Sequence, residues 1–459
     1  MLAQAANPAT ETAAMVVEGV PLSPIPAWGV IPFAVLLAAI AVLPLIHRTA
    51  HWWESNRNKF LVSIACGIVA LGAILSVHGG RAAGEAAGHA AAEFVPFMVL
   101  LGSLYVISGG ILVSGNLRGS PQVNAAILAF GAVAANFLGT TGASMLLIRP
   151  LLRANAGRAH RVHLVVFFIF LVSNVGGLLL PIGDPPLFLG YLRGVPFRWT
   201  LSLWAEWAVA TSVLLVAFFF LDAHLVRKEG GQPEPLEAPA DPLQPVVRIA
   251  GGVNVVWLAG VILAAAVLVP GRELRGFAVP VGAREVMMLA CAALSLATTP
   301  RGLREENRFT WGPILEVAAL FGGLFLAMQP ALELLVERGN QLGITTPTAF
   351  FWSTGLLSSF LDNAPTYLVF ADVARAVTPQ DAAGVPFSGG VIDPALLAAV
   401  SCGAVFMGAN TYIGNGPNLM VSAIAREDGV RMPTFFGYML WSCGILVPLF
   451  AVLTWLFFA

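Results

Sequence analysis

Hydrophobic residues occur along this chain in long blocks, which are separated by short polar segments rich in glycine and proline. An apolar run of about 20 residues is what a helix needs to cross the roughly 30 Å hydrocarbon core of a bilayer. Such runs are found at residues 26–46, 60–78, 94–114, 162–190, 200–222, 249–270, 284–300, 311–330, 394–425 and 434–458. They predict an all-α polytopic membrane protein with about ten transmembrane helices.

Two further apolar stretches, residues 122–154 and 347–376, are too long for one span. Each is interrupted at its centre by polar residues, LGTTGAS at 138–144 and LDNAPT at 361–366. We interpret both stretches as re-entrant hairpins, whose two ends lie on the same side of the membrane. With this layout, about two thirds of the 24 lysine and arginine residues fall on one side, which the positive-inside rule identifies as cytoplasmic. Both termini are then extracytoplasmic.

The order of elements before and after residues 227–248 is the same. That segment is rich in proline and charge and reads as a cytoplasmic linker between two inverted repeats, 26–226 and 249–459, after an extracytoplasmic segment at 1–25. Traces of the repeat survive in the sequence, since GDPP at 183–186 corresponds to GNGP after Ile413. Each half therefore contains a hairpin followed by an interrupted helix.

The first interruption falls at the depth of the bilayer midplane. A helix from Val162 to Val172 is about 16 Å long, half of the hydrocarbon core, so Ser173 and Asn174 lie near the middle. Glycine- and proline-induced kinks are common in membrane helices. Unwound backbone at this depth is nevertheless tolerated only where it is buried in protein or lines a wet cavity. The symmetric occurrence of two hairpin tips and two breaks favours a binding site at which they converge.

Composition narrows the class of protein. The chain is 58% hydrophobic and 11% charged, whereas soluble proteins carry about 25% charged residues. Its net charge of −1 gives no reason to expect a nucleic-acid partner. The sequence contains no P-loop, HExxH or CxxC motif, so we expect no ATP-driven motor, no enzyme and no cofactor apart from transported ions.

Two acids lie deep within the predicted core, Asp184 and Asp362. A charged group there is costly unless it is functional, and burial disfavours its charged form, so sodium and protons can compete for one carboxylate. Oxygen ligands suit a hard cation such as sodium. The other candidate binding residues belong to the tips and breaks, and they offer hydroxyl, amide or backbone groups: Thr140, Thr141, Ser144, Ser173, Asn174, Gly183, Asn363, Thr366, Asn410, Thr411, Gly414 and Asn415.

Other ionisable residues are given structural roles. Glu206, Glu316 and Asp372 lie nearer the ends of predicted spans, where a charged group can reach the interface. All seven histidines lie in or near predicted loops, and we interpret none of them as a buried proton relay.

The motifs GTTGASMLLIRPLLRAN, SNVGGLLLPIGDPPLFLG and LDNAPTYLVF resemble the ion transporter superfamily. The resemblance is to its NhaD-like and citrate-transporter-like bacterial members, often described as sodium:proton antiporters, and it covers nearly the whole chain after residue 25. It implies a dimeric carrier of the bacterial inner membrane with a scaffold and an elevator-type transport domain. It also implies that the tips and breaks hold the site.

One departure from the superfamily concerns the substrate. Its dicarboxylate carriers have Ser-Asn-Thr at both tips, whereas this chain has Thr140-Thr141-Gly142 and Asp362-Asn363-Ala364. We therefore expect a sodium/proton antiporter. The alternative is a sodium- or proton-coupled symporter of citrate or another carboxylate. A channel or a membrane-embedded enzyme fits less well, because a channel has no need for interrupted helices in inverted pairs and no nucleophile–base pair is visible.

Overall fold

The computed structural model describes residues 26–43, 46–53, 55–114, 119–230, 248–268, 270, 273–274, 277–307, 309–338, 343–361, 363–381 and 383–459. The first half contains η1 (Ala27–Val30), α2 (Ile31–Val42), α3 (His47–Trp53), α4 (Asn56–Gly109), β1 (Leu112–Ser114), α5 (Pro121–Ala154), α6 (Val162–Leu171), η2 (Val175–Leu179), α7 (Pro185–Leu192), η3 (Trp199–Leu203) and α8 (Trp204–Lys228). The predicted segments 1–25 and most of 227–248 lie outside the described residues.

The second half contains β2 (Arg248–Ala250), α9 (Val253–Val267), β3 (Glu273–Leu274), β4 (Phe277–Ala278), α10 (Ala283–Thr298), α11 (Leu303–Glu306), α12 (Gly312–Ala327), α13 (Gln329–Arg338), α14 (Pro347–Ser358), α15 (Asn363–Val377), β5 (Val385–Phe387), β6 (Gly390–Ile392), α16 (Pro394–Met407), η5 (Gly408–Asn410), α17 (Gly416–Glu427), α18 (Phe435–Leu453) and η6 (Thr454–Phe458). The strands form three antiparallel pairs, β1 with β2, β3 with β4 and β5 with β6, none of which the sequence predicted. In the first pair Leu112 is opposite Ala250, so the end of α4 is tied to the start of the second half.

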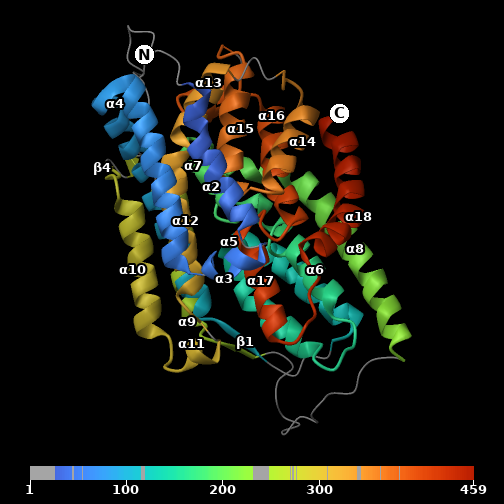
Figure 1. Ribbon diagram of the computed structural model, residues 1–459. Helices are drawn as coiled ribbons and strands as arrows, with labels where there is room; N and C mark the ends of the chain where they lie inside the picture. Colours follow the sequence, from blue (N-terminus) through green and yellow to red (C-terminus); the bar gives the residue numbers. More distant parts are fainter. Residues whose placement is uncertain are drawn as a thin grey trace.

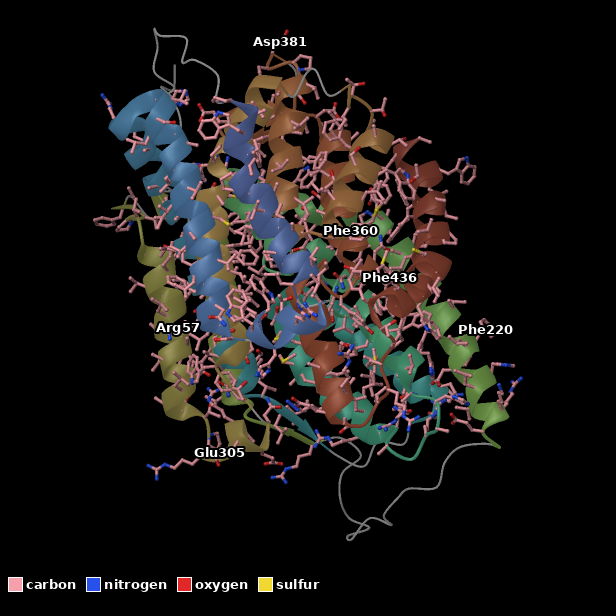
Figure 2. All side chains as sticks on the ribbon, viewed as in Figure 1. Arg57, Phe220, Glu305, Phe360, Asp381 and Phe436 are labelled. Carbon is pink, nitrogen blue, oxygen red and sulfur yellow. The ribbon has the colours of Figure 1, made fainter. Side chains whose placement is uncertain are left out.

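The chain has the architecture of an all-α membrane protein. Within the described residues, six helical segments are long and apolar enough to cross a membrane, and three shorter apolar helices accompany them. Figure 2 shows the acids Glu305 and Asp381 at opposite ends of the molecule, with the exposed side chains of Phe220 and Phe436 on the flank between them. The exact number of membrane crossings and the inverted repeat stay predictions.

Helix α4 differs from its prediction. The sequence predicts two spans, 60–78 and 94–114, with residues 79–93 as the connection between them. In the structure most of residues 79–93 are helical as well. The only non-helical residue inside α4 is Gly79, whose φ of +83° is in the region that favours glycine. The residues after it are rich in alanine, the strongest helix former, which explains why they extend the second helix instead of forming a loop.

Helix α5 is folded back on itself at Gly139, where φ is +72°. Near its two ends, the side-chain amides of Asn124 and Asn155 donate to each other, at 3.0 and 2.8 Å. These residues are 31 positions apart, and in a straight helix about 46 Å would separate them. Residues 121–154 therefore form a hairpin with its tip at Gly139. Its entry into a membrane from one side stays a prediction.

The second predicted hairpin corresponds to α14 and α15, which pack against each other. Thr346 begins α14 by accepting a hydrogen bond from the Ala349 N–H (3.2 Å). Asp362, the predicted site acid at its tip, lies outside the described residues. In Figure 1, α14 and α15 occupy one end of the molecule, whereas α5 extends towards β1 at the other end.

The helices pack in two groups. Helix α4 packs against α2, α9, α10 and α12, and these five form one side of the molecule in Figure 1. We call them the α4 group. On the other side α5 packs against α6, α8, η2 and α17, and α16 packs against α14 and α15, with α7 against α15. We call this set the hairpin group. Its centre is α6, which is buried from His163 to Leu171.

Candidate functional site

The buried carboxylate of Asp184 is the point at which both hairpins and both interrupted helices meet. Its Oδ1 accepts hydrogen bonds from the Thr140 hydroxyl of the first hairpin tip (2.8 Å) and from the Asn415 amide of the second break (3.3 Å). Its Oδ2 accepts from the amide of Asn363, the first residue of α15 (2.6 Å). Four segments far apart in the sequence thus converge on one acid, which lies only 1% exposed.

Close backbone contacts form the break before Asp184. Between α6 and α7 the chain makes the short helix η2 and then returns, so that a Cβ on Gly183 would lie 2.2 Å from the carbonyl oxygen of Gly177. The Gly183 carbonyl in turn accepts a hydrogen bond from the Thr140 N–H (2.8 Å), which fixes the hairpin tip against the break. Only glycine fits at position 183, because any side chain would overlap with backbone atoms.

The second break has the same construction. A Cβ on Gly414 would lie 2.5 Å from the carbonyl oxygen of Gly408. The same close approach occurs in the first break, between Gly183 and the Gly177 carbonyl. Asn415 precedes α17 with φ −154° and ψ 139°, while Asp184 precedes α7 with φ −141° and ψ 143°. Asp184 and Asn415 therefore occupy corresponding positions, one as an acid and the other as its amide counterpart.

A chain of amides connects the two breaks. The Asn415 amide also donates to the Ser173 carbonyl (3.0 Å) and to Asn174 Oδ1 (3.2 Å), and the Asn174 amide donates to Asn418 Oδ1 (2.8 Å). Asn418 donates back to the carbonyls of Gly408 and Thr411, each at 2.9 Å. Sequence analysis missed Asn418. The sequence did contain a signal for Asn418: it is the last residue of the GNGPN motif and lies in the first turn of the helix that follows the second break.

The other predicted site residues hold the tips in place. The Ser144 and Ser173 hydroxyls are 2.8 Å apart and join the first hairpin to the first break. In the second half, the Asn410 amide donates to Ser359 Oγ (2.9 Å) and the Thr411 hydroxyl donates to the Ser359 carbonyl (2.5 Å). These contacts join the hairpins to the breaks and thereby determine where the partners of Asp184 lie.

A small cavity opens onto Asp184 between the two groups of helices. Residues 139–142 and 182–185 line one side of it, and Phe97, Leu100 and Leu104 of α4 line the other. The space in it that the centre of a water-sized molecule can reach is about 20 Å³, enough for one water or a sodium ion. Thr141 lines this cavity, whereas Thr366 lines a second, apolar one between α2 and the second hairpin.

The groups around Asp184 suit a hard cation. The acid lies at the N-terminus of α7, and three donors hold its carboxylate. The buried Oδ1 of Asn363 accepts no hydrogen bond within the described part of the chain. Carboxylate, hydroxyl and amide oxygens are the ligands that sodium-like cations take in proteins. An amide that rotates by half a turn exchanges its donor for an acceptor, so Asn363 can serve Asp184 or a cation.

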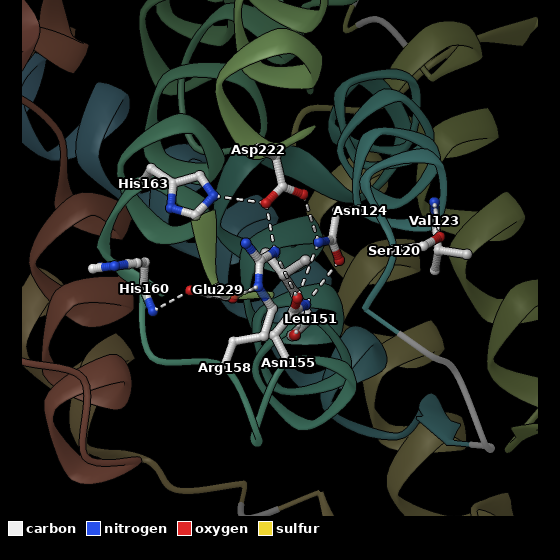
Figure 3. Close-up of polar contacts among 10 residues, drawn as sticks. All are labelled: Ser120, Val123, Asn124, Leu151, Asn155, Arg158, His160, His163, Asp222 and Glu229. Carbon is white, nitrogen blue, oxygen red and sulfur yellow. Dashed lines mark hydrogen bonds and ion pairs between the residues drawn. The ribbon is translucent and has the colours of Figure 1, made fainter. Parts of the chain in front are cut away.

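A second buried polar network lies at the base of the first hairpin, and sequence analysis missed it (Figure 3). Asp222 of α8 forms an ion pair with Arg158 and accepts hydrogen bonds from Asn124 (2.9 Å), and His163 Nε2 lies 2.9 Å from its Oδ1. Arg158 also donates to Glu229 at 3.1 Å. His163 lies near a loop, as expected, but its side chain is only 1% exposed. It stands in the first turn of α6, where the chain already enters the core.

Replacement of Asp222 by alanine is expected to destabilise the protein by about 1–3 kcal/mol, because buried Arg158 keeps only Glu229 as an acidic partner and the buried Asn124 amide loses one of its acceptors. Asp222→Asn, which keeps hydrogen-bonding capacity, should cost less. The free energy of unfolding in detergent measures both effects. Asp381→Asn, at an exposed position, is the matched control and should leave stability unchanged. Equal stability of the alanine variant and the wild type would exclude a structural role for the network.

Comparison with known proteins identifies a family whose model matches this chain. A family model described as "Putative citrate transport" matches residues 22–458, nearly the whole chain. No curated protein matches. The resemblance to citrate-transporter-like carriers that the tip and break motifs indicate is thereby confirmed.

Proposed function

The chain belongs to this citrate-transport family, and from that premise we propose that it is a secondary transporter that exchanges sodium for protons across the membrane. The observation that carries the proposal is the convergence of Thr140, Asn363 and Asn415 on the buried carboxylate of Asp184. A buried acid among oxygen ligands binds either a cation or a proton, and exclusive binding of the two is the minimal chemistry of an exchanger.

The exchange step follows from the charge of Asp184. When sodium enters, Asp184 releases its proton to the facing solution, sodium replaces the hydrogen bonds to the carboxylate, and Asn363 turns its Oδ1 to the ion. When sodium leaves, a proton from the facing solution neutralises the acid and the amides return to their present partners. Asp362 is proposed as a second acid of the same site, because it precedes Asn363 directly in the sequence.

Movement of the hairpin group against the α4 group is the proposed way in which the site changes sides. The cavity at Asp184 lies between these groups, with residues of the hairpin tip and the break on one wall and residues of α4 on the other. When one wall slides against the other, Asp184 is exposed in turn to the solution on each side of the membrane, and neither group of helices unfolds. This is the elevator motion that the family resemblance implies.

The surroundings of the carrier are part of the proposal. We propose a homodimer in the bacterial inner membrane with both termini outside the cytoplasm and with lipid around the exposed apolar flanks. The transported sodium and protons are its substrates, and no resident cofactor is proposed.

Carboxylate symport is the second candidate, because the family is described by citrate transport. The charge of the site opposes it. A citrate carboxylate about 6 Å from ionised Asp184 meets roughly 3 kcal/mol of repulsion at an effective dielectric constant near 20, whereas sodium gains by the same interaction. The donors that would recognise a carboxylate, the amides of Asn363 and Asn415, already serve Asp184.

The dependence of sodium affinity on pH distinguishes the two candidates. If each sodium displaces one proton, the apparent affinity should weaken about tenfold for each pH unit below the pH at which the site takes up its proton. Sodium-driven proton movement in proteoliposomes, measured over a pH series with and without citrate, gives this dependence. A flat affinity, with transport that requires citrate, would favour the carboxylate symporter.

A further inference from the structure

Another cluster of buried charges, separate from the Asp222 network, lies at the C-terminus of α7, the short helix that Asp184 precedes. Arg193 follows α7 directly, and its side chain is 12% exposed. It forms an ion pair with Glu93 of α4, whose side chain is 8% exposed, and its Nη1 lies 3.5 Å from Oδ2 of Asp372 in α15. Arg193 Nη1 also donates to Ser388 Oγ (3.1 Å). One arginine thus has two acidic partners.

The two acids belong to different groups of helices. Glu93 is part of the α4 group, whereas Asp372 lies on the second hairpin, together with α7 in the hairpin group. Within the described residues, the contact between Glu93 and Arg193 is the ion pair of this cluster that joins the two groups. The contact between Arg193 and Asp372 stays inside one of them.

Neither partner of the joining pair loses all of its polar contacts when that pair separates. Arg193 keeps Asp372, and Glu93 keeps His89, whose Nε2 lies 3.5 Å from its Oε1. Separation of a buried ion pair is prohibitive when it strands a charge. Here both partners have a second contact, and Asp372 has a further one in Arg375 at 3.4 Å. The pair is built so that it can open at moderate cost.

The geometry connects this pair to the site. Helix α7 consists of eight residues, about 12 Å, with Asp184 at its N-terminus and Arg193 immediately after its C-terminus. A short helix without an internal proline moves as a rigid unit. Whatever holds Arg193 against α4 therefore also holds Asp184 against the wall formed by Phe97 and Leu104.

We propose that the Glu93–Arg193 ion pair is a lock that holds α7 and Asp184 against α4 in the conformation seen here, and that it must open in every transport cycle. Asp372 competes with Glu93 for Arg193 and sets the strength of the lock. This inference rests on the proposed function, since it assumes that the hairpin group moves against the α4 group.

The test uses a cysteine pair that reports the distance between α4 and α7. Cysteines introduced at Leu101 and Phe188, which line the same cavity, are cross-linked in the full-length protein after the four native cysteines have been replaced. Glu93→Gln removes the charge of the lock and should lower the cross-linked fraction, with a roughly tenfold shift of the equilibrium, as expected of a charge-assisted hydrogen bond. Glu85→Gln, on the same helix but exposed, is the control and should leave it unchanged.

The opposite result is expected for Asp372→Asn. It removes the competing acid, so Arg193 should bind Glu93 more strongly and the cross-linked fraction should rise. A general loss of structure lowers cross-linking in both variants and cannot raise it in one. An unchanged or equally reduced fraction in the two variants overturns the lock. If the wild type transports sodium in that case, the proposed function stands without the lock, and if the wild type itself transports no sodium, the proposed function is wrong.

Discussion

Replacement of Asp184 by asparagine is expected to abolish sodium/proton exchange, with a loss of at least about 100-fold in the rate of sodium-driven proton movement. The acid is the only group with a formal charge among the described side chains that meet at the convergence of the tips and breaks. Asparagine keeps the size of the side chain, but it carries no negative charge to balance a cation and takes up no proton at physiological pH. Proton movement in proteoliposomes under a sodium gradient measures the loss.

Folding must be separated from transport in this variant. Asn415 already occupies the corresponding position of the second break as an amide, so an amide at position 184 is compatible with this backbone. The variant should therefore elute from size exclusion in detergent as the wild type does. Asp381→Asn is the matched control for the removal of one carboxylate and should transport normally. Wild-type transport by Asp184→Asn would assign Asp184 a structural role.

Gly183→Ala is expected to eliminate transport because it opens the first break. The added Cβ would lie 2.2 Å from the Gly177 carbonyl oxygen, a distance that no real Cβ contact reaches, so the backbone on which Asp184 is placed must move. A misplacement of about 1 Å at a site is enough for a 100-fold loss. We expect a fall in transport of that size or more, together with a lower melting temperature.

Gly416→Ala provides the control for this substitution. Gly416 lies in the corresponding segment of the second half, and a Cβ there meets no atom within 4 Å. The variant should retain transport and stability. If both alanine variants behave alike, the close approach of Gly183 to Gly177 is not what positions the site.

The breaks could be predicted from the sequence because their residues are unusual for a membrane. Glycine, proline and amides inside an apolar run have few explanations, and GDPP and GNGP predicted the segments that precede α7 and α17. Which residues contact one another could not be predicted in this way. Asn363 and Asn415 reach Asp184 only through the packing of α15 and α17 against the first half, and no local pattern encodes that.

Other features escaped sequence analysis for specific physical reasons. Asp222 and Arg158 stand near the ends of predicted elements, where charged residues usually face solvent, yet both side chains are fully buried because they neutralise each other. The helix through residues 80–93 was missed because its small and polar residues lack an apolar period, although alanine favours helix. Thr366 shares a motif with Asn363 but lines an apolar cavity next to α2.

The most direct test of the account is proton release on sodium binding. Purified protein in detergent and weak buffer is titrated with sodium chloride near the pH at which the site is half protonated, and the released protons are counted. Because half of the free sites carry a proton at this pH, competition at Asp184 predicts about half a proton per sodium bound, no release from Asp184→Asn and none from wild type on addition of citrate as a tetramethylammonium salt. Sodium binding without proton release, or a change in proton binding that occurs only with citrate, would contradict the exchange of sodium and protons at Asp184.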